Sequence, residues 1–117
     1  MPNHVVCISP AHMDPNYEIE RRVLGPDVEL RVFSATDSET IGREASDADA
    51  VMTWRMRVEA PAIEQFQRCK LIIRLGVGFD VVDIEAAKQH GIPVSNVPDY
   101  CTNEVADHAM GLLLTLE

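Results

Sequence analysis

Two stretches of this sequence carry the residue types from which an anion-binding site can be built. The first is the turn Gly76-Val77-Gly78, which follows an apolar run. Because glycine has no Cβ, a ligand can approach the backbone N–H groups of Val77 and Gly78 closely. The second is WRMR, residues 54–57, where Arg55 can form paired hydrogen bonds with a carboxylate or a phosphate and Trp54 can form a wall beside it.

The glycine turn is compatible with three interpretations. Its spacing begins the GxGxxG pattern that binds the pyrophosphate of dinucleotides, but Val81 stands where the third glycine is required. The turn can instead serve only to reverse the chain. In the third interpretation, the amides of Val77 and Gly78 hold a carboxylate or a similar small anion. The residues alone leave the last two interpretations open.

Histidines and cysteines add no recognised catalytic or metal-binding set. The four histidines share no metal-ligand spacing, and Cys7, Cys69 and Cys101 include no CxxC pair. Cys101 has no evident base beside it. Free thiols and an N-terminus without a signal-peptide pattern indicate a cytoplasmic protein. No apolar run is long enough to span a membrane, and the net charge of −9 argues against nucleic acid and anionic membranes as partners.

Short apolar runs alternate with helical patterns, and this alternation predicts the scaffold. Strict alternation implies a parallel sheet with helices on both faces. Five such units in 117 residues match the flavodoxin-like arrangement, with strand order 2-1-3-4-5 and ligands at the carboxyl ends of the strands. We expect strands at His4–Ile8, Val28–Phe33, Ala50–Thr53, from Leu71, and at Ile92–Asn96, and helices at Asp14–Leu24, Glu39–Ala48, Ala60–Cys69, Val82–His90 and Thr102–Leu116. Asp14, Asp37 or Ser38, and Thr102 are the expected N-caps.

The last helix has more apolar surface than a helix with one buried face requires. Val105, Ala109 and Leu112 belong to one apolar stripe, and Met110 and Leu114 extend it to a second face. We therefore expect this helix to be covered on two sides, by its own sheet and by another domain or subunit. The predicted organisation is a domain over residues 1–101 and a connecting or dimerisation helix over residues 102–117.

Residues 70–116 resemble the D-isomer-specific 2-hydroxyacid dehydrogenases. The pieces that carry the resemblance are LGVGFDVVDIEAA, GIPVSNVP and EVADHAMGLLL, in that order. The resemblance implies a flavodoxin-like substrate-binding domain in which the amides of Val77 and Gly78 hold the carboxylate of a small 2-oxo or 2-hydroxy acid. It also implies a basic substrate contact at Arg55, a cleft lined by the segment around Cys101 and Thr102, and a last helix that reaches a nucleotide-binding domain and takes part in dimerisation.

The same resemblance implies that this chain does no chemistry alone. In the family, the GxGxxG motif and the catalytic arginine, glutamate and histidine belong to the nucleotide-binding domain, and these 117 residues do not contain it. We expect the full protein to reduce a 2-oxo acid with NADH or NADPH, and this chain alone to be inactive, with no catalytic residue and no bound cofactor or metal. The alternative is a non-enzymatic module of the corepressor type, which uses the same fold for protein contacts or dimerisation.

Overall fold

A single parallel sheet organises the body of the protein. The computed structural model describes residues 2–10 and 14–117. In these residues the strands run in the order β2-β1-β3-β4-β5, and every neighbouring pair is parallel. The predicted flavodoxin-like order is therefore confirmed. The strands are β1 (His4–Ile8), β2 (Val28–Val32), β3 (Ala50–Thr53), β4 (Leu71–Arg74) and β5 (Val94–Ser95).

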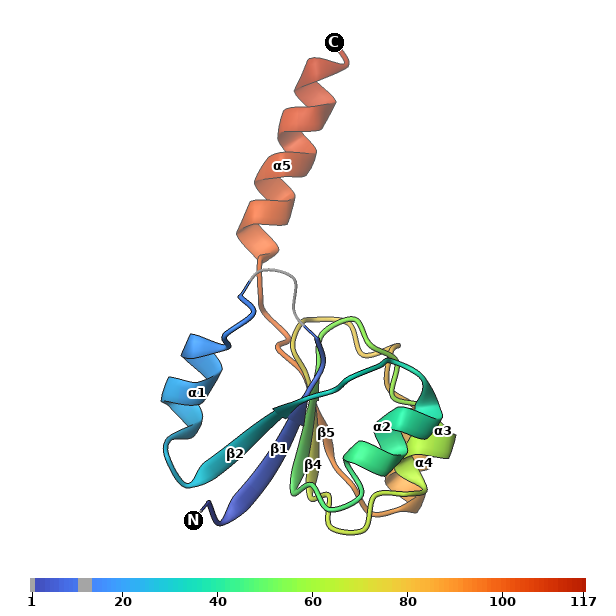
Figure 1. Cartoon of the computed structure of the whole chain (residues 1–117). Coiled ribbons are helices and arrows are strands. Elements are labelled where there is room, and N and C mark those ends of the chain that lie inside the picture. The colour runs from blue at the N-terminus through green and yellow to red at the C-terminus, as the bar shows by residue number, and fades with distance from the viewer. Residues whose placement is uncertain (1, 11–13) are drawn as a thin grey trace.

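Helices cover the two faces of the sheet unequally. On one face lies α1 alone, whereas α2, α3 and α4 pack together on the other, as Figure 1 shows. The larger core lies under these three helices, and Ile41, Val51, Ile63 and Ile72 in it are completely buried. A smaller core lies under α1. The helices are α1 (Glu18–Leu24), α2 (Ser38–Glu44), α3 (Ala60–Ile63), α4 (Ile84–Gln89) and α5 (Thr102–Thr115).

The start of α1 differs from the sequence prediction. Asp14 does not cap the helix directly; its carboxylate accepts hydrogen bonds from the backbone N–H groups of Asn16 and Glu18 across a turn. Tyr17 adopts a left-handed conformation with φ of 54° and precedes the first helical residue. Its ring is buried and its hydroxyl donates to the Ser9 carbonyl oxygen at 3.2 Å. Burial of Tyr17 thus delays the helix, because the chain must turn to bring the ring inward.

The helices α2 and α3 are shorter than their sequence patterns suggest. Asp37 caps α2 as predicted, since its carboxylate accepts from the N–H of Thr40 at 2.8 Å. Beyond α3 the backbone bonds to distant segments instead of continuing the helical pattern. The N–H of Gln67 donates to the Ser46 carbonyl oxygen and that of Lys70 donates to the Asp49 carbonyl oxygen. Tertiary hydrogen bonds therefore end α3 earlier than local propensity would.

The last helix, α5, projects from the body and does not pack on its own sheet (Figure 1). All of its residues are exposed, including Met110, Leu112 and Leu114. The prediction that its own sheet covers one side is therefore wrong. The reason is the path of the loop after β5, which leaves the end of the sheet and leads away from it. Cys101, with φ of 60°, occupies the N-cap position that was assigned to Thr102. Within the described residues, no helix is both long and apolar enough to cross a membrane.

Candidate functional site

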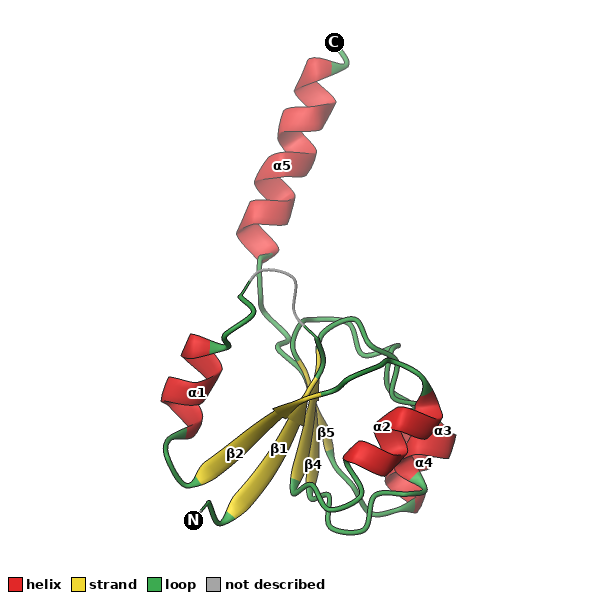
Figure 2. Cartoon of the chain, in the orientation of Figure 1, coloured by secondary structure: helices red, strands yellow, loops and turns green. Residues whose placement is uncertain are grey.

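The carboxyl ends of β3 and β4 bring the two predicted anion-binding stretches to the same edge of the sheet. Thr53 is in register with Arg74, and the N–H of Leu75 donates to the Thr53 carbonyl oxygen at 2.7 Å. The WRMR loop and the glycine turn therefore leave neighbouring strands at the same end. Figure 2 shows that the loop leading to α5 emerges at this end as well. The position agrees with the rule that ligands of such sheets bind beyond the carboxyl ends of the strands.

Hydrogen bonds hold two carbonyl groups of the glycine turn and leave the amides of Val77 and Gly78 available. The Gly76 carbonyl oxygen accepts from the N–H of Val97 at 2.9 Å, and the Val77 carbonyl oxygen accepts from Asn96 Nδ2 at 2.7 Å. The N–H groups of Val77 and Gly78 donate to no other described residue. Both residues are exposed, so the two adjacent donors can be reached from solvent.

The two glycines of this turn are needed for different reasons. Neither has a positive φ, so the turn does not depend on a left-handed backbone. A Cβ on Gly76 would lie 2.1 Å from Nη1 of Arg74, which is far inside van der Waals contact. A Cβ on Gly78 would meet nothing nearer than Asp80 Oδ1 at 3.4 Å, an ordinary contact. A side chain at Gly76 would therefore require the Arg74 guanidinium to move, whereas one at Gly78 would require no rearrangement.

Arg74 is a site residue that the sequence prediction missed. Its Nε and Nη1 are buried and find no hydrogen-bond partner in the described part of the chain. The guanidinium lies against Gly76, at the base of the glycine turn. A buried cation without a partner is unfavourable, and an anion placed at the turn would relieve this cost. The signal in the sequence is a charged residue that ends the apolar run Leu71–Ile73 directly before the glycines.

The predicted residues Trp54 and Arg55 lie beside each other after β3. Arg55 Cζ is 4.8 Å from the centre of the Trp54 ring, a cation–π contact. The N–H of Trp54 donates to Ser9 Oγ at 3.0 Å, which ties the loop to the end of β1. Trp54 and Leu75 line one small hollow of about 230 Å³. Arg55 and Trp54 both line a second hollow of about 480 Å³, together with Asp37 and other residues near the carboxyl ends of β1, β2 and β3.

Cys101 and Thr102 lie where the loop after β5 meets α5. Cys101 is half-buried and Thr102 is exposed. The hydrogen bond between the side chains of Tyr100 and Cys101 raises the pKa of the Tyr100 hydroxyl. In residues 2–10 and 14–117, no hydrogen bond connects either residue to the glycine turn. Their assignment to the substrate cleft therefore stays a prediction.

The other thiols lie away from this edge and have no activating environment. Burial raises the pKa of Cys7 to about 11, and it also raises that of Cys69. Both thiols are therefore protonated near neutral pH, the form that is unsuited to nucleophilic attack. Among the described residues, no three histidine, cysteine or acidic side chains gather in a way that could hold a metal ion.

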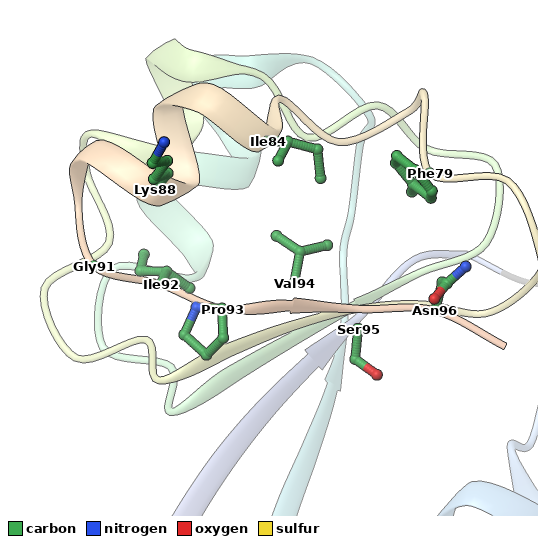
Figure 3. A pocket seen from close by; sticks show the side chains of 9 residues that line it. All are labelled: Phe79, Ile84, Lys88, Gly91, Ile92, Pro93, Val94, Ser95 and Asn96. Atoms are coloured by element: carbon green, nitrogen blue, oxygen red, sulfur yellow. The ribbon is translucent and has the colours of Figure 1, made fainter. Parts of the chain in front are cut away.

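A hollow of about 560 Å³ lies away from the arginines, between α4 and the free edge of β5. Figure 3 shows Ile84, Val94 and Phe79 around it, with Lys88 at one end and Asn96 at the other. Apart from the Lys88 ammonium, its lining contains no ionisable side chain. The hollow therefore offers apolar contact and little chemistry, and the polar groups at the carboxyl edge make the better candidate site.

Comparisons with known proteins identify relatives over nearly the whole chain. The family model of the catalytic domain of D-isomer specific 2-hydroxyacid dehydrogenases matches residues 6–116. A hydroxypyruvate reductase of Blautia hydrogenotrophica is 32% identical over 110 residues, which are 94% of this chain and 33% of that protein. A D-3-phosphoglycerate dehydrogenase of Methanocaldococcus jannaschii is 36% identical over 102 residues, which are 86% of this chain and 20% of the relative.

A solved structure agrees with these sequence relatives. The D-lactate dehydrogenase of Aquifex aeolicus, solved with NAD and lactic acid, matches with a TM-score of 0.79 and 25% sequence identity. The match covers 95% of this chain and 33% of that enzyme. This chain therefore spans about a third or less of the relatives named here.

Proposed function

We propose a substrate-binding role for this chain, which belongs to the D-isomer specific 2-hydroxyacid dehydrogenase family. The ligand is the carboxylate of a small 2-oxo or 2-hydroxy acid, held at the turn that follows β4. One observation carries the proposal: the amides of Val77 and Gly78 donate to no other described residue, and they follow Gly76, against which lies an Arg74 guanidinium whose Nε and Nη1 are buried without a partner in the described residues. Adjacent amides and a guanidinium form the charge-assisted hydrogen bonds that a carboxylate accepts.

The other predicted residues surround this carboxylate site in the proposal. Trp54 forms one wall, because it shares a hollow with Leu75, the residue directly before the glycine turn. Arg55 stacks on Trp54 and supplies a cation for the distal end of the substrate. Cys101 and Thr102 close the cleft from the side of α5. These roles follow from the positions of the residues at one edge of the sheet, where the loops after parallel strands meet.

For the whole protein, we propose NAD- or NADP-dependent reduction of a 2-oxo acid. The nicotinamide would supply the hydride, and a general acid outside these 117 residues would supply the proton. The share of this chain is to bind and orient the acid through its carboxylate. We further propose that residues 1–101 form the substrate-binding domain and that α5 connects it to a nucleotide-binding domain. In the absence of that domain, no hydride transfer is expected.

A titration with small acids tests the carboxylate site. Glyoxylate, pyruvate and hydroxypyruvate are added to the 15N-labelled chain, and the amide and arginine Nε–H resonances are recorded. We expect the largest shifts at Val77, Gly78 and Arg74, and much smaller ones with pyruvamide, which has the same shape without the charge. Equal shifts with pyruvamide, or no shifts at these three residues, would count against the proposal.

The exposed surface of α5 favours a second role, self-association. Apolar side chains at Val105, Leu112 and Leu113 are more than half exposed, a pattern typical of helices that bind another domain or subunit. We propose that two copies of this chain pair through residues 102–116, as the corepressor-type alternative also requires. Sedimentation over a range of concentrations should show dimers that Leu113→Glu abolishes and the control Asn103→Glu preserves. A monomer at every concentration would contradict the pairing.

A further inference from the structure

We infer that Asn96 is a positioning residue, whose side chain aims the amide of Gly78 at the carboxylate site. The inference rests on the proposed function, since it gives a role to a residue that supports the same glycine turn. Asn96 lies directly after β5, and its Nδ2 donates to the Val77 carbonyl oxygen at 2.7 Å. No other side chain in the described residues holds a carbonyl group of this turn.

Because the peptide bond is planar, the contact between Asn96 and the Val77 carbonyl fixes the direction in which the N–H of Gly78 points. In a trans peptide unit, the carbonyl of one residue and the N–H of the next point in opposite directions. The hydrogen bond from Val97 to the Gly76 carbonyl therefore aims the N–H of Val77 away from β5. In the same way, the hydrogen bond from Asn96 to the Val77 carbonyl aims the N–H of Gly78. Asn96 and Val97 thus orient the amides of Gly78 and Val77, so that both can bind the same ligand.

The hydrogen bonds from Val97 and Asn96 differ in how much they depend on the residue type at each position. Val97 donates through its backbone, so almost any residue at that position would preserve the contact. Asn96 donates through its side chain and requires an amide at this length. A carboxylate in its place has no proton to donate and would repel the Val77 carbonyl oxygen. The amide of Gly78 is therefore the one whose direction a single substitution can change.

The fold places Asn96 so that it can hold the turn firmly. Figure 3 shows Asn96 at the end of β5, next to Ser95 and below Phe79. The backbone of β5 is anchored to β4, where the N–H of Ile72 donates to the Pro93 carbonyl oxygen at 3.0 Å. The side chain that holds the turn thus projects from a strand end, which is a rigid support.

Asn96→Asp is the decisive variant, because it conserves size and removes the donor. Ser95→Ala is the matched control, since Ser95 is exposed and its side chain points away from the hollow that Asn96 lines. Without ligand, we expect a shifted amide resonance for Gly78 in N96D, and little change for Val77. With pyruvate, we expect the dissociation constant to rise about tenfold in N96D, the equivalent of one hydrogen bond to a charged ligand.

The outcomes separate this inference from the proposed function. An unaltered Gly78 amide in N96D would overturn the inference, as would equal effects on Val77 and Gly78 or equal pyruvate affinity in N96D and the unsubstituted chain. Asn96→Gln retains the amide donor and is expected to recover part of the affinity. Failure of the unsubstituted chain to bind any carboxylate would refute the proposed function alone, because the resonance of the Gly78 amide is also compared without ligand.

Discussion

Polar groups have hydrogen-bond partners at the amino end of the sheet, whereas several at the carboxyl end have none among the described residues. At the amino end, the Asp49 carboxylate accepts hydrogen bonds from the N–H of Val5 at 2.9 Å and from Arg68 Nη2 at 3.0 Å. At the carboxyl end, two nitrogens of Arg74 are buried without a partner, and the amides of Val77 and Gly78 are free within the described structure. Buried polar groups in folded proteins are nearly always paired. The paired groups at the amino end serve the fold, and the carboxylate of the proposed function would supply a partner for the groups at the carboxyl end.

The contribution of the amino end to the stability of the fold depends on pH. The hydrogen bond from the Val5 backbone, together with the nearby Arg68, holds the pKa of the Asp49 carboxyl below its usual range. A carboxyl with a lowered folded pKa contributes stability above its unfolded pKa and loses it as the pH falls through the folded value. This contribution is therefore complete near neutral pH and disappears in acid.

Removal of the Asp49 carboxylate should have the largest effect of the changes considered. Asp49→Ala leaves the half-buried N–H of Val5 without its acceptor and Arg68 without its ion-pair partner. We expect the free energy of unfolding to fall by about 2 kcal/mol at pH 7, measured by urea denaturation, because a hydrogen bond to a charged group is lost. The difference from the unsubstituted chain should shrink below about pH 4, where the unfolded-state carboxyl is protonated. A difference that stays constant with pH would show that Asp49 does not act through its charge.

Replacement of Arg74 should act on the carboxyl end in the opposite direction. Arg74→Met removes the buried guanidinium and retains much of the apolar volume, so we expect the unliganded chain to gain about 1 kcal/mol of stability. The stabilisation of the unsubstituted chain by added pyruvate should vanish in this variant. Arg57→Met is the control, because Arg57 forms an exposed ion pair with Glu59 and no other ion pair within residues 2–10 and 14–117. A loss of stability in R74M would mean that the guanidinium serves the fold.

Replacement of Gly76 or Gly78 by alanine should change stability least, and comparison of the two variants tests whether the two glycines are needed for different reasons. Gly76→Ala forces the Arg74 guanidinium to move, and we expect a loss of stability of about 1 kcal/mol as well as weaker binding. Gly78→Ala meets only an ordinary contact, so its stability should change by less than about 0.5 kcal/mol while pyruvate affinity falls. Thermal unfolding and the titration described above measure both quantities. Equal stability losses would contradict the separate reasons given for the two glycines.

Much of the fold could be predicted because strand signals are local. The runs at His4–Ile8 and Ala50–Thr53 form strands with the predicted bounds, and the strict alternation with helices determines the parallel order. Helix ends were less predictable, since burial of Tyr17 and the hydrogen bond from Gln67 to Ser46 are tertiary events. The exposed position of α5 depends on the loop path after β5, which apolar periodicity does not encode.

For the candidate site, the amino-acid sequence by itself determined the glycine turn, the neighbouring arginine loop and the family, because these depend on residue identity and order. Only the tertiary structure decided which groups are left without partners. Arg74 in the sequence is one more charged residue, and burial against Gly76 makes it an unpaired cation. Asn96 is a loop residue until β5 places its amide on the Val77 carbonyl. Solvation and hydrogen-bond partners come from segments distant in sequence, so only the folded chain determines them.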